Sequence, residues 1–421
     1  MRNNKICVIG LGYVGLPLAF NLSKHFELIG FDSSKKRILD LKDNVDQTNE
    51  IKTSELKKAK ISFTYETKDI QECNIYIVTV PTPINSKNNP QITSLISVTK
   101  MIASYLKNND LIIYESTVFP GCTEEILIPL IEKISKKKLN KNFYVGYSPE
   151  RIDPGFSKYK LSNQIKVISG SSKQTVARVG KIYKTIIKKG IFVAKNIKVA
   201  EAAKIIENTQ RDINIAFINE VSMLFHKMKI NTNEVLKAAN TKWNFLNFKP
   251  GLVGGHCIGV DPYYLKFKAL KEGFRPKLIS SGRSINDFMP KFIFKEIKKE
   301  VEKKKKRLKN LKILFLGVTF KENCNDFRNS KAISLLKLLK KNNDIDIFDN
   351  LVNKNLLAEK EKIKLISKIS KKNFYDVIIV SVPHNKIKSF KINFLKKLCK
   401  KSGIIIDIKS IYSKEQVEWQ L

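Results

Sequence analysis

A glycine pattern near the start of the chain constrains the fold more than any other feature. Gly10, Gly12 and Gly15 follow an apolar, strand-like run at Lys5–Ile9 and open a stretch with helical spacing. Glycine at these positions permits a tight turn and lets backbone N–H groups approach a pyrophosphate at the N-terminus of a helix. The pattern predicts the first unit of a dinucleotide-binding sheet. The alternative is a glycine-rich turn in a packed sheet.

The residue that ends the next strand indicates which dinucleotide is bound. The strand-like run Glu27–Phe31 is followed by Asp32. A carboxylate at this position accepts hydrogen bonds from the ribose hydroxyls and repels an additional phosphate, which favours NAD over NADP. We therefore predict NAD as the cofactor.

Strands alternate with helices at both ends of the chain, which favours parallel, doubly wound sheets. In the first part, further strand-like runs are Ile75–Val80, Leu111–Glu115 and Phe143–Gly146. The C-terminal part repeats the order with a strand at Lys312–Leu316, a turn at Gly317, a helix at Ser330–Lys341 and a strand at Asp344–Phe348. The turn at Gly317 lacks the full glycine pattern, so this copy need not bind a dinucleotide. We predict an α/β fold with two Rossmann-like doubly wound domains, joined by a long central helix from Val199 to about Phe225.

The composition bears on the class of partner. The formal net charge is +39, but the lysines are scattered through every segment of the 421 residues. Nucleic-acid binders concentrate basic residues on one face or tail, so nucleic-acid binding is the less favoured interpretation. No apolar run is long enough to span a bilayer. The basic start followed by ICVIGLGYVGLPLAF resembles a signal peptide, but the glycine spacing explains this stretch better.

The six cysteines lack the spacing of metal ligands, so we expect no metal site. Cys7 and Cys73 lie in or beside apolar runs and are interpreted as core thiols. The default location is a reducing cytoplasm.

One cysteine is a candidate nucleophile. Cys257 lies in the segment GGHCIGVD, where flanking glycines would let a substrate approach. A nucleophilic thiol needs a nearby cation, which Lys204 on the predicted central helix could provide, with Asn208 one turn later on the same face. Asp261 could orient a water or an ammonium. The alternatives are a buried structural cysteine and, for His256, a hydrogen-bonded neighbour instead of a base.

The chain resembles the UDP-glucose/GDP-mannose dehydrogenase family over nearly its whole length. Within that family it is similar to the Vi-antigen-type branch that oxidises UDP-N-acetylglucosamine at C6. The segments that carry the resemblance are GLGYVGLPLA, TVPTPIN, YESTVFPGCTEE, YSPERIDPG, KVAEAAKIIENTQRDINIAFINE, GLVGGHCIGVDPYYL and GVTFKENCNDFRNS.

The resemblance implies a four-electron oxidation of the primary alcohol of a sugar to a carboxylate, with two NAD reduced. Cys257 would attack the aldehyde to give a thiohemiacetal and then a thioester. Lys204 and Asn208 would hold the reacting oxygen, and Asp261 would position Lys204 and a water. Glu150 would be the acid–base residue with Thr117 as its hydroxyl partner.

The resemblance also implies the binding residues and the domains. The cofactor would be bound by Gly10, Gly12, Tyr13, Val14, Gly15, Asp32, Arg37, Thr82 and Arg328. The UDP-sugar would be bound by Glu150, Arg151, Lys204, Asn208, Arg211, Lys249, Gly254 and Lys321, with the loop Phe245–Val253 closing over the sugar. The expected domains are 1–197 for NAD, 198–295 for the central helix, substrate loop and dimerisation, and 310–421 for UDP-sugar binding. A cytoplasmic homodimer that serves surface-polysaccharide synthesis is expected.

Several alternatives stay open. Lys249 stands where the branch often has Arg, and Cys324 where other branches have Thr, which leaves the exact sugar undetermined. UDP-N-acetylgalactosamine, UDP-glucose and a two-electron NAD dehydrogenase are the competing functions. Glu150 could instead be a surface carboxylate paired with Arg151.

Overall fold

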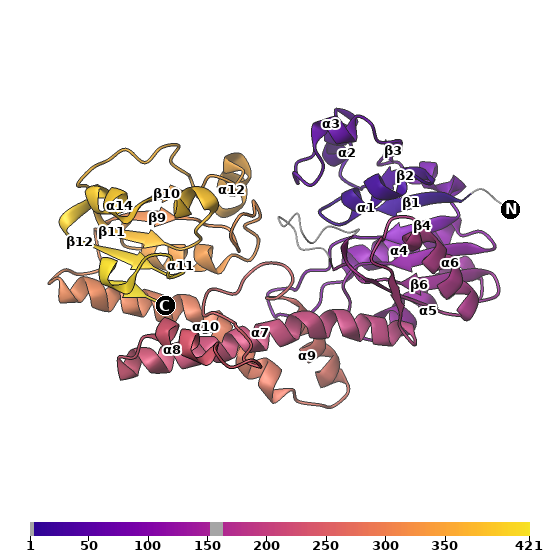
Figure 1. Cartoon of the computed structure of the whole chain (residues 1–421). Coiled ribbons are helices and arrows are strands. Elements are labelled where there is room, and N and C mark those ends of the chain that lie inside the picture. The colour runs from indigo at the N-terminus through magenta and orange to yellow at the C-terminus, as the bar shows by residue number, and fades with distance from the viewer. Residues whose placement is uncertain (1–3, 152–162) are drawn as a thin grey trace. The chain divides into compact units, whose positions relative to one another are not determined.

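A computed structural model of the protein describes residues 4–151 and 163–421 (Figure 1). The chain divides into two compact units, one made of residues 1–207 and 263–275 and the other of 208–262 and 276–421. Helix α7 (Ile197–Met228) is continuous from the first unit into the second. Each unit contains one sheet.

The first unit contains a sheet in the order β3-β2-β1-β4-β5-β6-β7-β8, parallel except for the β6/β7 pair. Its strands are β1 (Lys5–Ile9), β2 (Glu27–Phe31), β3 (Ile61–Thr64), β4 (Ile75–Val78), β5 (Asp110–Tyr114), β6 (Phe143–Tyr147), β7 (Lys166–Gly170) and β8 (Ile191–Val193). The order reverses between β1 and β4, and ligands of open α/β sheets bind at the carboxyl ends of the strands at such a point.

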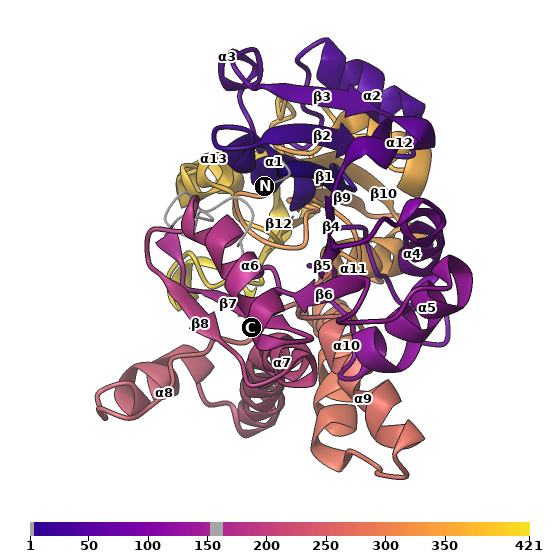
Figure 2. The same cartoon turned by 90° about the vertical axis from the view of Figure 1, so that its right-hand side faces the viewer.

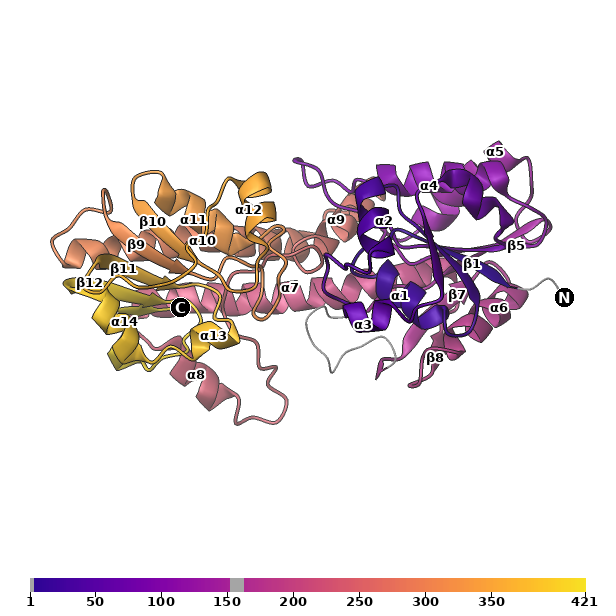
Figure 3. The same ribbon diagram turned by 90° about the horizontal axis from the view of Figure 1, so that it is seen from above.

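Helices cover both faces of this sheet (Figures 2 and 3). Helices α1 (Gly15–Leu22), α2 (Lys35–Lys42) and α6 (Lys173–Lys184) pack on one face, against alternate buried residues such as Ile6, Val8 and Ile77. Helices α4 (Thr93–Tyr105) and α5 (Ile128–Ser135) lie on the other face. The short α3 (Thr53–Leu56) precedes β3, and α9 (Asp261–Lys271) follows the Cys257 segment.

The second unit contains a parallel sheet in the order β10-β9-β11-β12-β13. The strands are β9 (Lys312–Leu316), β10 (Asp344–Phe348), β11 (Tyr375–Val380), β12 (Cys399–Asp407) and β13 (Trp419–Gln420). Helices α10 (Lys277–Lys303), α11 (Lys331–Lys340) and α12 (Lys354–Glu361) pack on one face, and α13 (Asn385–Lys388) and α14 (Ile392–Leu398) on the other (Figure 3). Helix α8 (Thr232–Ala239) follows α7.

The predicted α/β fold with two doubly wound sheets is confirmed, and the predicted bounds of β1, β2, β9 and β10 agree with the structure. The central helix is longer than predicted. It begins at Ile197, where the Asn196 side chain accepts a hydrogen bond from the Val199 N–H at 2.8 Å and so supports the first turn.

Candidate active site

The glycine turn after β1 leaves room for a ligand at one position only. A Cβ on Gly15 would lie 1.8 Å from the carbonyl oxygen of Gly10, so close packing excludes any side chain there. A Cβ on Gly12 would meet no atom within 4 Å. Val14 is the N-cap of α1, and its side chain makes no capping hydrogen bond. The first N–H groups of the helix therefore lie at the glycine turn without a side-chain acceptor from the N-cap. This arrangement fits a pyrophosphate approaching the backbone at Gly12.

Asp32 and Arg37 brace the same turn. The Asp32 carboxylate accepts hydrogen bonds from the N–H groups of Leu11 and Ser34, both at 2.9 Å. The Arg37 guanidinium donates from Nε to the Leu11 carbonyl oxygen at 3.0 Å and from Nη2 to Asp46 at 2.8 Å. Its buried Nη1 has no partner among the described residues. A partly exposed carboxylate and an unsatisfied guanidinium nitrogen beside an open turn fit the adenosine end of NAD.

Two further predicted residues lie together beyond β4 and β5. The Thr82 hydroxyl donates to the carbonyl oxygen of Thr117 at 2.6 Å. The Tyr264 hydroxyl donates to the carbonyl oxygen of Thr82, which ties α9 to this edge of the first sheet. Thr82 and Thr117 therefore lie together beyond the carboxyl ends of β4 and β5, the edge of the sheet where ligands of open α/β sheets bind.

Glu150 belongs to a buried charge cluster. Lys166, which is 3% exposed, bonds to Glu115 at 2.7 Å and to Glu150 at 3.3 Å. Burial opposes its charge, but the two carboxylates outweigh this effect and raise the pKa of Lys166. The alternative of a surface Glu150 paired with Arg151 is wrong, because Glu150 is 8% exposed and the Arg151 guanidinium pairs with Glu207. Residues 152–155 of the YSPERIDPG segment lie outside the described residues.

In the second unit, Cys257 is the one cysteine of six that is not buried. Its carbonyl oxygen accepts from the N–H groups of Val260 and Asp261, at 2.9 and 2.8 Å, in the turn that opens α9. The Asp261 carboxylate accepts from the Asn208 side-chain amide at 2.6 Å. The structure thus brings together three of the predicted catalytic residues, Cys257, Asp261 and Asn208, around one turn. Lys204 lies one turn before Asn208 on α7, buried in the first unit.

The glycines before Cys257 are explained by packing against the segment 318–330. A Cβ on Gly254 would lie 2.5 Å from the Asn329 carbonyl oxygen, and one on Gly255 would lie 2.7 Å from the Phe320 ring. Gly255 also has a φ of +86°, which glycine adopts without strain. The sequence predicts these glycines as room for a substrate, whereas in the structure they let the cysteine turn rest against the 318–330 segment.

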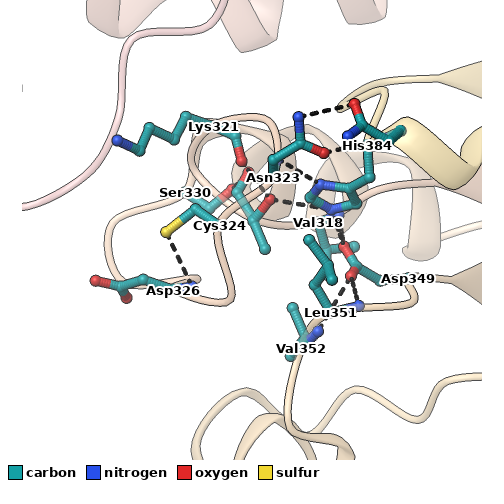
Figure 4. A network of polar contacts seen from close by, with 12 residues as sticks. Val318, Lys321, Asn323, Cys324, Asp326, Ser330, Asp349, Leu351, Val352 and His384 are labelled. Carbon is teal, nitrogen blue, oxygen red and sulfur yellow. Dashed lines mark hydrogen bonds and ion pairs between the residues drawn. The ribbon is translucent and has the colours of Figure 1, made fainter. Parts of the chain in front are cut away.

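The remaining predicted binding residues of the second unit differ in their surroundings. Arg328 donates to both carboxylate oxygens of Asp326, from Nη2 at 2.6 Å and from Nε at 3.0 Å. Arg211 and Lys249 are exposed. Lys321 lies on the loop shown in Figure 4, where the Thr319 hydroxyl donates to its carbonyl oxygen at 2.8 Å.

The second sheet has a turn like that of the first, but the carboxylate at this turn is hydrogen-bonded to a buried histidine (Figure 4). Asp349 follows β10 as Asp32 follows β2, and it accepts from the Val318 N–H at 2.9 Å. His384, fully buried, lies 3.0 Å from the same carboxylate through Nε2, while its Nδ1 accepts from the Asn323 N–H at 2.9 Å. Because Nδ1 accepts, Nε2 carries the proton, and its N–H donates to the Asp349 carboxylate. This carboxylate is 2% exposed and hydrogen-bonded within the protein, in agreement with the incomplete glycine pattern.

The residues that support the site from a distance are not among those that the sequence predicts. These are Glu115, Lys166, Tyr183, Tyr264, Asp326 and His384. A charged residue inside an otherwise apolar strand was the only signal for Lys166. The others carry no local pattern, because each partner lies far away in the sequence.

Comparison with known proteins identifies the family. Residues 4–187, 198–288 and 314–414 match, in this order, the NAD binding, central and UDP binding domains of the UDP-glucose/GDP-mannose dehydrogenase family. The chain belongs to this family. It is 45% identical to a UDP-N-acetyl-D-glucosamine 6-dehydrogenase of Salmonella typhi, over 99% of this chain and 98% of the relative. A protein of the same name from Pseudomonas aeruginosa is 44% identical, over 100% of both chains.

A solved structure of a related dehydrogenase has a similar fold. The UDP-D-ManNAc dehydrogenase of Pyrococcus horikoshii aligns with a TM-score of 0.89 and 29% identity, over 99% of this chain and 98% of that one. The protein is accordingly an NAD-dependent dehydrogenase of a UDP-sugar. In the part of the chain that the structure describes, no helix has the length and apolarity to cross a membrane. The same residues contain no group of side chains suited to a metal ion.

Proposed function

We propose that this dehydrogenase oxidises the 6-hydroxymethyl group of UDP-N-acetylglucosamine to a carboxylate, in two successive oxidations on one enzyme. Two relatives that are 44–45% identical along almost their full length carry the name UDP-N-acetyl-D-glucosamine 6-dehydrogenase. The product is a nucleotide-linked uronate for surface-polysaccharide synthesis. We place the enzyme in the cytoplasm, where a reducing environment suits six cysteines without disulfides.

The chemistry uses Cys257 to keep the aldehyde on the enzyme. Gly12 and Asp32 would hold NAD, which would supply the hydride acceptor for the two oxidations. The Cys257 sulfur adds to the aldehyde carbon to form a thiohemiacetal, and oxidation of this adduct gives a thioester. Water then attacks the thioester carbon, the C–S bond breaks, and the carboxylate and the thiol are released.

The other predicted catalytic residues have complementary roles. Lys204 and Asn208, one turn apart on α7, stabilise negative charge on the reacting oxygen. Asp261 orients Asn208 through their 2.6 Å hydrogen bond. Glu150 moves the proton of the attacking water, with Thr117 as the hydroxyl partner that the family resemblance implies, and Lys166 holds the Glu150 carboxylate.

The substrate and cofactor contacts extend the same proposal. The sugar nucleotide is bound by Arg151, Arg211, Lys249, Gly254 and Lys321, and the cofactor also contacts Tyr13, Val14 and Arg328. We retain the division into a region for NAD (1–197), a central region (198–295) and a region for the UDP-sugar (310–421).

The observation that carries the mechanism is the partial exposure of Cys257, since the other five cysteines are buried. A two-electron dehydrogenase has no need of an accessible thiol. The test measures NADH formed per sugar consumed with UDP-glucose, UDP-N-acetylglucosamine and UDP-N-acetylgalactosamine. Two NADH per sugar, with UDP-N-acetylglucosamine preferred, is the expected result.

The matching variant is Cys257→Ser, with the buried Cys399→Ala as the control. Cys257→Ser should abolish uronate formation, with a loss of at least about 10³-fold in kcat, whereas Cys399→Ala keeps it. One NADH per sugar in the unaltered enzyme, or normal uronate formation by Cys257→Ser, would contradict the thioester mechanism.

We also infer a homodimer formed through α7. Five apolar side chains on this helix are between 44% and 60% exposed: Val199, Ile206, Phe217, Leu224 and Met228. At about 100° per residue, they fall within about 40° of one another around the helix axis. An apolar stripe along a long helix favours association with a second copy of the chain, as the family resemblance implies.

A further inference from the structure

The loop that follows β9 carries Lys321 and lies at the switch point of the second sheet. The strand order β10-β9-β11-β12-β13 reverses between β9 and β11, so this loop (residues 318–324, the Lys321 loop) and the segment 381–388 after β11 flank that point. Ligands of open α/β sheets bind there, at the carboxyl ends of the strands. Both segments also belong to residues 314–414, which match the UDP binding domain of the family. The conformation of the Lys321 loop therefore bears on the binding of UDP.

Asn323 ties this loop to the segment after β11. Its backbone N–H donates to Nδ1 of His384 at 2.9 Å (Figure 4). Its side chain accepts from the Asn385 N–H at 2.9 Å and donates to the Asn385 side-chain oxygen at 3.0 Å. Asn323 has a φ of +55°, a left-handed conformation that asparagine adopts more readily than most residues with a side chain. The end of the loop is thus held through the backbone and the side chain together.

His384 is itself fixed by the carboxylate that follows β10. The ring is fully buried, and its Nε2 N–H donates to Asp349 at 3.0 Å. Asp349 also accepts from the Val318 N–H at 2.9 Å, so one carboxylate holds both the start of the Lys321 loop and the ring that binds its end. Because an ionised carboxylate only accepts, it keeps the proton on Nε2 and leaves Nδ1 as the acceptor that the Asn323 N–H requires.

The same ring reaches the backbone of Lys321. The Thr319 hydroxyl lies 3.3 Å from Nε2 of His384 and donates to the Lys321 carbonyl oxygen at 2.8 Å. In Figure 4 the Lys321 side chain extends away from His384 and Asp349. Its Nζ lies 5.7 Å from the centre of the Phe320 ring. The network therefore fixes the backbone around Lys321 and so sets the direction in which the ammonium projects.

We propose that His384 is a positioning residue for UDP binding, which holds the Lys321 loop in the conformation that directs the ammonium to the sugar nucleotide. The loop is held through Asn323 and Thr319. The inference rests on the proposed contact between Lys321 and the sugar nucleotide. It requires neither the thioester chemistry nor a particular sugar, because every candidate substrate contains UDP. The carboxylate at the turn of the second sheet thus orients the histidine that supports the substrate loop.

The test is calorimetric titration of the full-length enzyme with UDP, using two substitutions of His384 that each keep one half of its contacts. Glutamine places its amide near the position of Nε2, and asparagine places its side-chain oxygen near the position of Nδ1. His384→Gln loses the acceptor of the Asn323 N–H and should weaken UDP binding by about fivefold or more, the equivalent of one hydrogen bond. His384→Asn keeps this acceptor and should bind UDP within about twofold of the unaltered enzyme. Equal losses in the two variants would contradict the role of Nδ1.

Asn323→Gly tests the same loop without a substitution in the core. Glycine adopts a positive φ without strain, so the change removes the two side-chain hydrogen bonds to Asn385 and leaves the backbone conformation accessible. UDP binding should weaken by about threefold or more. The matched control is Asn310→Gly, the same change at an exposed position with a φ of +57° before β9, which should leave the UDP affinity unaltered.

A double-mutant cycle with Lys321→Ala separates positioning from a general loss of stability. If the loop acts through Lys321, Asn323→Gly should weaken UDP binding in the unaltered background and change it little in Lys321→Ala. Equal effects in both backgrounds would overturn the inference, as would unaltered UDP affinity in both His384→Gln and Asn323→Gly. Unaltered affinity in Lys321→Ala would remove the contact on which the inference rests and overturn it as well. None of these titrations depends on uronate formation, so a failure of the thioester mechanism would be seen separately, in Cys257→Ser.

Discussion

At the scale of single residues, the site contains carboxylates that are hydrogen-bonded to groups of the protein itself. Asp32 accepts from two backbone N–H groups of its own turn, and Asp326 joins His256 to Arg328. Each carboxylate fixes the conformation of the segment around it. Removing one therefore changes both the shape and the charge of the site, so a variant should alter one property at a time.

The pH dependence of stability tests the His256–Asp326 pair. Burial lowers the pKa of His256, but Cys257 and the hydrogen bond to Asp326 outweigh it and raise this pKa from 6.5 to about 9 in the folded state. These contacts therefore stabilise the folded state fully below pH 6.5, and their contribution disappears as pH rises through about 9. Because the side chain is 32% exposed, we expect only about 1 kcal/mol. The difference in melting temperature between the unaltered protein and His256→Gln should be largest near pH 6 and shrink toward alkaline pH. A difference that stays constant across this range would contradict the pairing.

At the scale of elements, α7 holds the segment that leads to the cysteine turn. The side chain of Asn219, which is fully buried, pairs with the peptide of Gly251 in both directions. Its Nδ2 donates to the Gly251 carbonyl oxygen at 3.0 Å, and its Oδ1 accepts from the Gly251 N–H at 2.7 Å. Asn286 of α10 accepts from the same Nδ2 at 2.8 Å. The loop predicted to close over the sugar thus ends on a rigid support.

Replacing Asn219 should weaken substrate binding more than the chemical step. Asn219→Ala leaves a buried peptide group without partners, which costs about 1–3 kcal/mol. We expect a several-fold increase in KM for the sugar nucleotide, a smaller change in kcat, and faster hydrogen exchange in residues 245–253. Glu220→Ala, on an exposed neighbouring position of α7, is the control. Unchanged kinetics and exchange in Asn219→Ala would show that the loop does not depend on this contact.

At the scale of the whole molecule, one chain contains two sheets of related topology with different tasks. In the first, Asp32 is partly exposed beside an open glycine turn. In the second, His384 and the Val318 N–H engage the equivalent Asp349. This difference assigns the dinucleotide to the first sheet, and the second matches the UDP binding domain of the family. The apolar stripe of α7 remains exposed in the single chain.

Association of two chains through that stripe is testable by sedimentation. The unaltered enzyme should sediment as a dimer, and Phe217→Glu combined with Leu224→Glu should shift it toward the monomer, because charges buried in an apolar interface are costly. Lys237→Glu, exposed on α8, makes a charge change elsewhere and should leave the dimer intact. A monomeric unaltered protein, or a dimer that tolerates both glutamates, would exclude this interface.

The sequence by itself determined whatever depends on local spacing. The glycines after β1, the carboxylate that follows β2, the bounds of β1, β2, β9 and β10, and the continuous α7 follow from periodicity and from the backbone conformations that glycine permits. The motif around Cys257 also predicts a candidate nucleophile, and this role stays a prediction.

Only the tertiary structure decided which charges meet. Lys166 reaches Glu115 across 51 positions, and His384 reaches Asp349 across 35, so no local pattern records either pair. The same holds for His256 and Asp326, and for the packing of Gly254 on the Asn329 carbonyl. Such contacts depend on how elements pack, and burial then sets the protonation of the groups. The sequence predicts where the nucleophile lies, and the packing determines which groups surround it.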